Sequence, residues 1–143
     1  MFAAFPLLAL PVLVYNLMLF ALPGGLKTAD ATTQFADKVF TIRMMSGGEW
    51  VLSLGDLFLA ASLVILFIEL LKSTTSRRVA IINHSLSMIL FIICLVEFLL
   101  FAGFSTSVFF IITLMVLLDV LAGFIVTIIA ARRDIDLVGP AGN

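Results

Sequence analysis

Ionisable side chains within apolar stretches are the residues of this sequence that could carry chemistry. Four carboxylates, one histidine and the asparagine beside it interrupt stretches that are otherwise almost uncharged: Asp56, Glu69, Asn83, His84, Glu97 and Asp119. A charged group is costly inside a bilayer, so an ionisable residue there is a candidate for contact with a proton, an ion or a partner. These six residues make up the candidate site.

Asp119 lies deepest, near the middle of the last apolar stretch. An unpaired charge at that depth costs about 3 kcal/mol even on the lenient insertion scale. We therefore expect its carboxyl group to be protonated, paired, facing a polar cavity or in contact with another subunit. Ala122 and Gly123 follow at i+3 and i+4, and small residues let a neighbouring helix come close. A structural hydrogen bond between helices is the alternative, with three candidate partners: Asn16, Ser87 and Thr113.

Three of the other candidates also have structural interpretations. Ser53 and Asp56 match the capping-box spacing S-x-x-D ahead of an apolar run, which predicts that Asp56 binds free amides of a first helical turn. Glu69 precedes Lys72 by three residues and can pair with it near the membrane surface. His84 is either a satisfied interfacial histidine or a pH-sensitive group that faces Glu69 across a short helical hairpin.

Helical geometry separates the polar residues of the third apolar stretch. At about 100° per residue, Asn83 and Glu97 point in one direction and His84 points roughly 140° away from Glu97. We therefore expect two polar layers rather than one catalytic centre. The inner layer holds Glu69, Asn83 and His84, the outer layer holds Asp56, Glu97 and Asn16, and Asp119 lies between them. Such a ladder suits proton movement, and it equally suits a bundle that needs one hydrogen bond per layer.

The sequence contains none of the standard catalytic or cofactor motifs. With one histidine and one cysteine, Cys94, a single chain has no metal-ligand spacing. A phosphate-binding loop, a dinucleotide fingerprint, a zinc-protease motif and a nucleophile elbow are all absent. A net charge of -1 makes nucleic acid an unsuitable partner. We expect no cofactor and no metal.

The composition predicts that these residues are carried by transmembrane helices. The chain of 143 residues is 63% hydrophobic and 12% charged, far more apolar than a soluble domain. We predict an all-α membrane protein in a single domain, because each apolar stretch is long enough to cross a bilayer as a helix. The four predicted transmembrane helices lie at about 2–22, 50–71, 79–102 and 107–131, followed by a tail at 132–143.

The first loop is the only long hydrophilic segment, at 28–45. Ala31, Phe35, Val39 and Ile42 follow at the spacing of one helical face. This pattern predicts a short amphipathic helix at the membrane surface. Trp50 comes next, where an aromatic anchor at the headgroup level is expected.

The basic residues predict the topology. Lys72, Arg77 and Arg78 flank the second turn, and Arg132 and Arg133 follow the last apolar stretch, whereas the third turn has no basic residue. The positive-inside rule then places both termini in the cytoplasm and the segment 28–45 in the periplasm. The stretches 48–70 and 83–98 are similar to those of small bacterial inner-membrane proteins, which implies that membrane as the location and no particular site.

Three functions stay open on these grounds. The first is a small non-catalytic accessory or assembly subunit of a larger inner-membrane complex, of respiratory, photosynthetic or transport type. The second is a homo-oligomeric proton- or ion-coupled transporter or channel that uses Asp119 and Glu97. The third is a redox or lipid-modifying membrane enzyme that uses His84. The expected partners are the lipid bilayer and other membrane subunits, or further copies of this chain.

Overall fold

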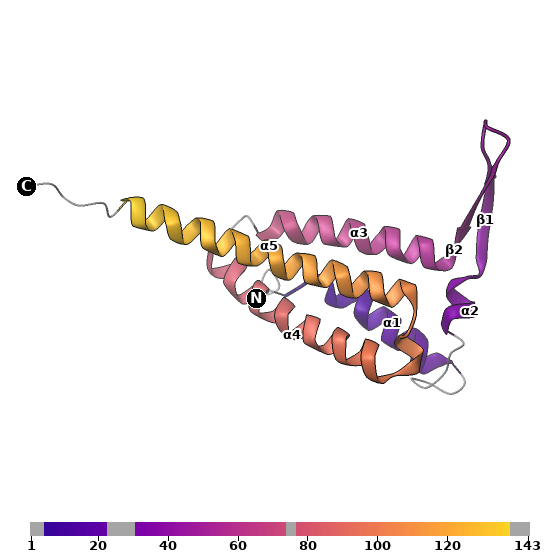
Figure 1. The fold of residues 1–143 in the computed structure, drawn as a ribbon, viewed down its shortest axis with the longest axis horizontal. Coiled ribbons are helices and arrows are strands. Elements are labelled where there is room, and N and C mark those ends of the chain that lie inside the picture. Colours follow the sequence, from indigo (N-terminus) through magenta and orange to yellow (C-terminus); the bar gives the residue numbers. More distant parts are fainter. Residues whose placement is uncertain (1–4, 23–30, 74–76, 138–143) are drawn as a thin grey trace, which may run out of the picture.

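The computed structural model describes residues 5–22, 31–73 and 77–137, and side chains are described outside 73, 77–80 and 130–137. The chain is mostly helical, with one small two-stranded sheet (Figure 1). In chain order the elements are α1 (Ala9–Ala21), α2 (Ala31–Phe35), β1 (Lys38–Arg43), β2 (Glu49–Ser53), α3 (Leu54–Ser73), α4 (Arg77–Leu100), η3 (Ala102–Phe104) and α5 (Ser107–Leu137).

Three of the helices are long and apolar enough to cross a bilayer. The apolar parts are 54–72 in α3, 81–100 in α4 and 107–129 in α5. The fourth predicted crossing, at 2–22, contains the shorter apolar helix α1, which has 13 residues. Four spans are therefore not established. Pro11 lies in the first turn of α1, where proline is tolerated, and residues 2–4 of the predicted stretch lie outside the described residues.

The capping box fixes the start of α3. The Ser53 hydroxyl accepts a hydrogen bond from the Asp56 amide at 3.1 Å, and the Asp56 carboxylate accepts one from the Ser53 amide at 2.9 Å. This is the reciprocal pattern that the S-x-x-D spacing predicts. The helix therefore begins at Leu54, and the predicted start near residue 50 is wrong because residues 50–53 belong to a strand.

The first loop forms a β-hairpin rather than the predicted amphipathic helix. Helical structure in the described part of this loop covers only α2, and β1 pairs with β2 in antiparallel fashion. Residues 39–42 read Val-Phe-Thr-Ile, a run of β-branched and aromatic residues that favours a strand. Gly47 adopts a left-handed conformation (φ 84°) that permits the reversal between the strands. The prediction of a helix over 28–45 is therefore wrong, and residues 28–30 lie outside the described residues.

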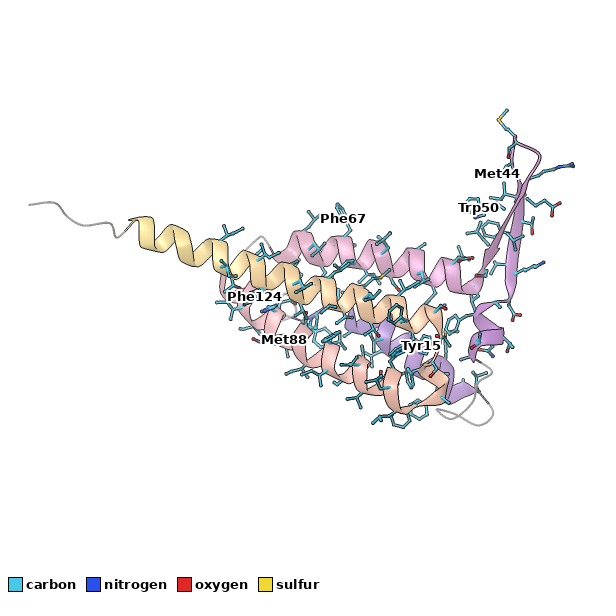
Figure 2. All side chains as sticks on the ribbon, in the orientation of Figure 1. Tyr15, Met44, Trp50, Phe67, Met88 and Phe124 are labelled. Atoms are coloured by element: carbon cyan, nitrogen blue, oxygen red, sulfur yellow. The ribbon has the colours of Figure 1, made fainter. Side chains whose placement is uncertain are left out.

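The long helices pack side by side, with α5 between α3 and α4 and with α1 beside α4 and α5 (Figures 1 and 2). The close pairs Ser87–Asp119 and Phe98–Phe110 show that α4 and α5 run antiparallel. Apolar side chains cover the outside of these helices, as expected for helices that face lipid.

An aromatic cluster around Tyr15 closes the end of the bundle nearest the hairpin. The Tyr15 ring stacks on Phe35 with 5.0 Å between ring centroids and also contacts Phe109 at 4.8 Å. Its hydroxyl group hydrogen-bonds the Thr106 hydroxyl at 2.7 Å and donates to the Gly103 carbonyl at 3.1 Å. Tyr15 thereby holds α1 and α2 against the turn between α4 and α5.

Candidate functional site: polar clusters between the helices

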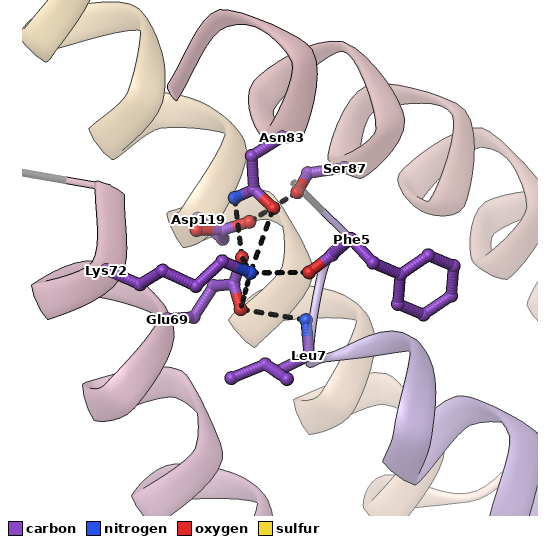
Figure 3. A network of polar contacts seen from close by, with 7 residues as sticks. All are labelled: Phe5, Leu7, Glu69, Lys72, Asn83, Ser87 and Asp119. Atoms are coloured by element: carbon purple, nitrogen blue, oxygen red, sulfur yellow. Dashed lines mark hydrogen bonds and ion pairs between the residues drawn. The ribbon is translucent and has the colours of Figure 1, made fainter. Parts of the chain in front are cut away.

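Glu69 is the centre of the largest polar cluster (Figure 3). Its side chain on α3 is fully buried, with 0% exposure. The Asn83 side-chain amide on α4 donates to its Oε1 atom, and the Lys72 ammonium group lies 3.3 Å from the same oxygen. The Leu7 backbone amide donates to Oε2 at 2.8 Å. One carboxylate thus joins α3, α4 and the residues that lead into α1.

Lys72 extends this cluster to the backbone before α1. Its ammonium group donates to the Phe5 carbonyl and to the Asn83 side-chain oxygen, the latter at 3.4 Å. The described chain therefore enters α1 beside the C-terminal end of α3, held by both members of the Glu69–Lys72 pair.

Asp119 lies next to the same cluster. Its carboxylate, 3% exposed, accepts a hydrogen bond from the Ser87 hydroxyl. Of the three predicted partners, Ser87 is the one that bonds Asp119. Ser87 lies one helical turn after Asn83 on the inward face of α4 (Figure 3). Asp119 was expected between two layers, and it lies instead with Glu69 and Asn83.

His84 points to a different neighbour from the one expected. It packs on Gly123 of α5, where an added Cβ atom would lie 2.5 Å from Nδ1 and 2.9 Å from Cγ of the imidazole ring. Asn83 rather than His84 contacts Glu69, because adjacent helical residues point about 100° apart. Nδ1 of His84 is buried and has no hydrogen-bond partner among the residues that the structure describes.

Glu97 belongs to a second, smaller cluster. Its carboxylate accepts a hydrogen bond from the Asn16 side-chain amide at 3.4 Å, and the same amide group donates to the Val12 carbonyl at 3.1 Å. This contact joins α4 to α1. Asp56 was expected in the same layer, but it is exposed and caps α3.

Apolar side chains separate the two clusters. Between Ser87 and Glu97 the inward face of α4 carries Cys94, and the facing part of α5 carries Ile112 and Val116. All three of these side chains are buried in the core. About ten helical residues, or roughly 15 Å, lie between Ser87 and Glu97. Two buried hydroxyl groups also lie in this region, those of Ser62 on α3 and Thr113 on α5, and each donates to a backbone carbonyl of its own helix. The described residues therefore form two polar clusters between the helices.

The side-chain partners of the acids were among the candidates that the sequence offered, and the backbone partners were not. The backbone groups of Phe5 and Leu7 gave no signal, because any residue has them. The pair Asn83 and Ser87, spaced i, i+4 on a helix that is otherwise apolar, was the signal for an inward polar stripe. Within the described part of the chain there is no group of three potential metal ligands.

Comparison of the chain with protein-family models, with curated proteins and with solved structures finds no match.

Proposed function

We propose that this protein is a small non-catalytic accessory or assembly subunit of a larger complex in a bacterial inner membrane. The supporting observation is the engagement of the intramembrane acids. Glu69, Asp119 and Glu97 each accept hydrogen bonds from another helix of the same chain, and mostly apolar side chains lie between the two clusters. Polar groups arranged in this way fix the positions of helices, as one would require of a rigid subunit.

The proposal includes a topology with both termini in the cytoplasm. The Leu7–Glu69 hydrogen bond places the start of α1 at the C-terminal end of α3, and α5 ends on that side of the bundle too (Figure 1). Lys72, Arg77 and Arg78 lie at this end, as the positive-inside rule requires of a cytoplasmic side. The hairpin then lies in the periplasm, and α1 is a fourth, short crossing.

We infer that a cytoplasmic partner binds at the end of α5. This helix has 31 residues and is about 46 Å long, against about 30 Å for the 20 residues of α3. It therefore continues beyond the other helices (Figure 1). Its last turns carry the charged residues Arg132, Arg133, Asp134 and Asp136. A charged helix that extends from a membrane bundle is well suited to electrostatic recognition of another subunit.

The test is the native mass of the protein extracted from its own membranes in a mild detergent, with identification of the chains that co-purify. We expect an assembly that contains other membrane proteins. The R132A/R133A variant should lose those partners, whereas K38A/R43A, which removes two positive charges from the hairpin, should keep them. A protein that runs as a monomer, with no native assembly containing it, would contradict the proposal.

A proton-coupled homo-oligomer is the second candidate, and one observation favours it. Nδ1 of His84 is buried without a described partner, and the imidazole ring packs on Gly123, one helical turn after Asp119 on α5. A histidine beside an acid can exchange a proton within the membrane. Proton flux in proteoliposomes that falls in D119N and H84Q but not in the surface variant S85A would favour this function over the first.

A further inference from the structure

The two faces of the hairpin differ in chemistry. Phe40 pairs with Leu52 and Ile42 pairs with Trp50, and residues paired across antiparallel strands share a face. One face is therefore entirely apolar. The opposite face carries the pairs Thr41–Val51 and Arg43–Glu49. The hairpin is therefore an amphipathic ribbon. Its apolar face consists of Phe40, Ile42, Trp50 and Leu52.

Most of this apolar face is uncovered in the isolated chain. Trp50 is 52% exposed and Phe40 and Ile42 are exposed to similar extents, whereas Leu52 at the base of the hairpin is 9% exposed. A single two-stranded hairpin is only marginally stable in water, so its apolar face requires a cover. Met44 and Met45 add exposed apolar side chains at the tip.

The direction of the hairpin indicates what covers it. The strands run across the axes of the helices instead of continuing along them (Figure 1). If α3, α4 and α5 cross a bilayer, a ribbon with this direction lies parallel to the bilayer surface. β2 passes into α3 without a linker, since Ser53 ends the strand and Leu54 begins the helix. The base of the hairpin is therefore held at the depth where α3 leaves the membrane.

The apolar face is turned towards the lipid side. Leu52 is buried, so the face to which it belongs looks towards the helices, and Trp50 two residues earlier shares that face. Figure 2 places Trp50 on the side of the hairpin nearer α3. The apolar face is thus continuous with the lipid-facing surface of α3, which begins with the exposed Leu54. Arg43 and Glu49 point away from that side.

We propose that the hairpin lies flat on the bilayer, with its apolar face in the boundary between phospholipid headgroups and acyl chains. Tryptophan favours this level, because its indole ring is apolar and its N–H group can still reach polar partners. The opposite face, called the charged face because it carries Arg43 and Glu49, remains in water. This inference requires the three long helices to cross a membrane and does not depend on the accessory role. Its effect is to hold the first loop against the membrane surface.

Trp50 is the only tryptophan of the chain, so its fluorescence reports on this face directly. The experiment uses the full chain at low density in vesicles of phosphatidylcholine and phosphatidylglycerol. Quenching by lipids brominated near the headgroup is compared with quenching by iodide present on both sides of the membrane. We expect brominated lipid to lower the fluorescence by roughly half or more, since the indole sits at the headgroup level, and iodide to have little effect.

The matched control moves the single tryptophan to the other face, as W50F/V51W. Its fluorescence should respond to iodide and only weakly to brominated lipid. If Trp50 responds to iodide as strongly as this control, the hairpin stands in water and the proposal is wrong. If Trp50 is protected from both quenchers, a protein surface such as a second copy covers the face, and the proposal is wrong as well.

A second pair of variants tests whether the apolar face causes the attachment. I42D places a carboxylate beside Trp50 on the apolar face, whereas T41D places the same group on the charged face. Lipid quenching of Trp50 should fall in I42D and stay unchanged in T41D. Equal lipid quenching in both variants would overturn the proposal. The hairpin lies outside the helical core, so neither variant removes a buried contact of the bundle.

Discussion

At the scale of single residues, the buried acids are matched to hydrogen-bond donors on other helices. The Asp119 carboxyl group accepts a hydrogen bond from Ser87, which is the structural alternative among those that the sequence left open. The sequence indicated Asp119, because a charged residue in an apolar run is conspicuous. It could not choose among three hydroxyl or amide partners, because that choice depends on the rotation and offset of two helices.

The Ser87–Asp119 contact should give a measurable coupling energy. In a double-mutant cycle with S87A and D119A, we expect a coupling of about 0.6 kcal/mol and at most about 2 kcal/mol, the range found for hydrogen bonds between membrane helices. The buried thiol of Cys94, the single cysteine, can report unfolding in detergent through a thiol-reactive dye.

Ser85 supplies the control for this cycle. It lies two residues before Ser87 on an exposed face of α4, and its hydroxyl group binds the Ile81 carbonyl of the same helix. The cycle of S85A with D119A should give no coupling. Equal coupling energies for Ser85 and Ser87 would show that the Ser87–Asp119 hydrogen bond is not the source of the measured coupling energy.

The packing of His84 on Gly123 leads to a second prediction. G123A should destabilise the protein by about 1–3 kcal/mol, because the added methyl group overlaps the imidazole ring and overpacking costs this much. H84A should remove most of that penalty, so the two changes are non-additive.

The same thiol-reactivity assay checks this prediction. G48A is the matched control, since a Cβ atom there meets only the Ser46 hydroxyl at 3.7 Å. A G123A variant as stable as G48A would mean that α4 and α5 lie further apart than described.

At the scale of elements, the three long apolar helices were predictable, whereas the hairpin was not. A run of about twenty apolar residues has few alternatives in a membrane protein. The segment 31–42 is ambiguous, because Ala31, Phe35, Val39 and Ile42 fit one helical face and residues 39–42 also fit a strand. Pairing with residues 49–53 decided the outcome, and that long-range contribution is invisible to local periodicity.

The capping box provides a prediction for α3. S53A should cost about 1 kcal/mol, because the Asp56 amide loses its acceptor and the helix start loses a cap. S53T keeps the hydroxyl group and should retain most of the stability. Hydrogen exchange at residues 54–57 measures the effect locally. Unchanged protection of these amides in S53A would indicate that tertiary packing alone fixes the helix start.

At the scale of the whole molecule, the polar cluster around Glu69 unites parts of the chain that no local pattern connects. Leu7 and Glu69 are separated by 62 positions, and the group supplied by Leu7 is a backbone amide. The sequence therefore indicated Glu69 as a candidate that pairs with Lys72, but not that it is fully buried or that it contacts the start of α1. The position of α1 beside the C-terminal end of α3 depends on this contact, and it carries the topology that we propose.

Single cysteines introduced in a C94A background test that topology. Met45 lies at the fully exposed tip of the hairpin, and Ala3, Ser76 and Ala141 mark the N-terminus, the second turn and the C-terminus. A membrane-impermeant maleimide applied to intact cells with a permeable outer membrane should label M45C. It should label A3C, S76C and A141C only after the inner membrane is opened.

The pattern follows from the arrangement of the helices. If α3, α4 and α5 cross the membrane, S76C and A141C must respond alike, because two crossings separate them. Labelling of A3C then shows whether α1 crosses the membrane. The 13 residues of this helix span only about 20 Å of an apolar layer about 30 Å thick. The Glu69–Lys72 pair holds the chain at residues 5 and 7 near one surface, so α1 with its flanking residues should complete the crossing. Labelling of A3C together with M45C in intact cells would mean that both ends of α1 lie on the periplasmic side. This result would contradict the fourth crossing and the cytoplasmic N-terminus.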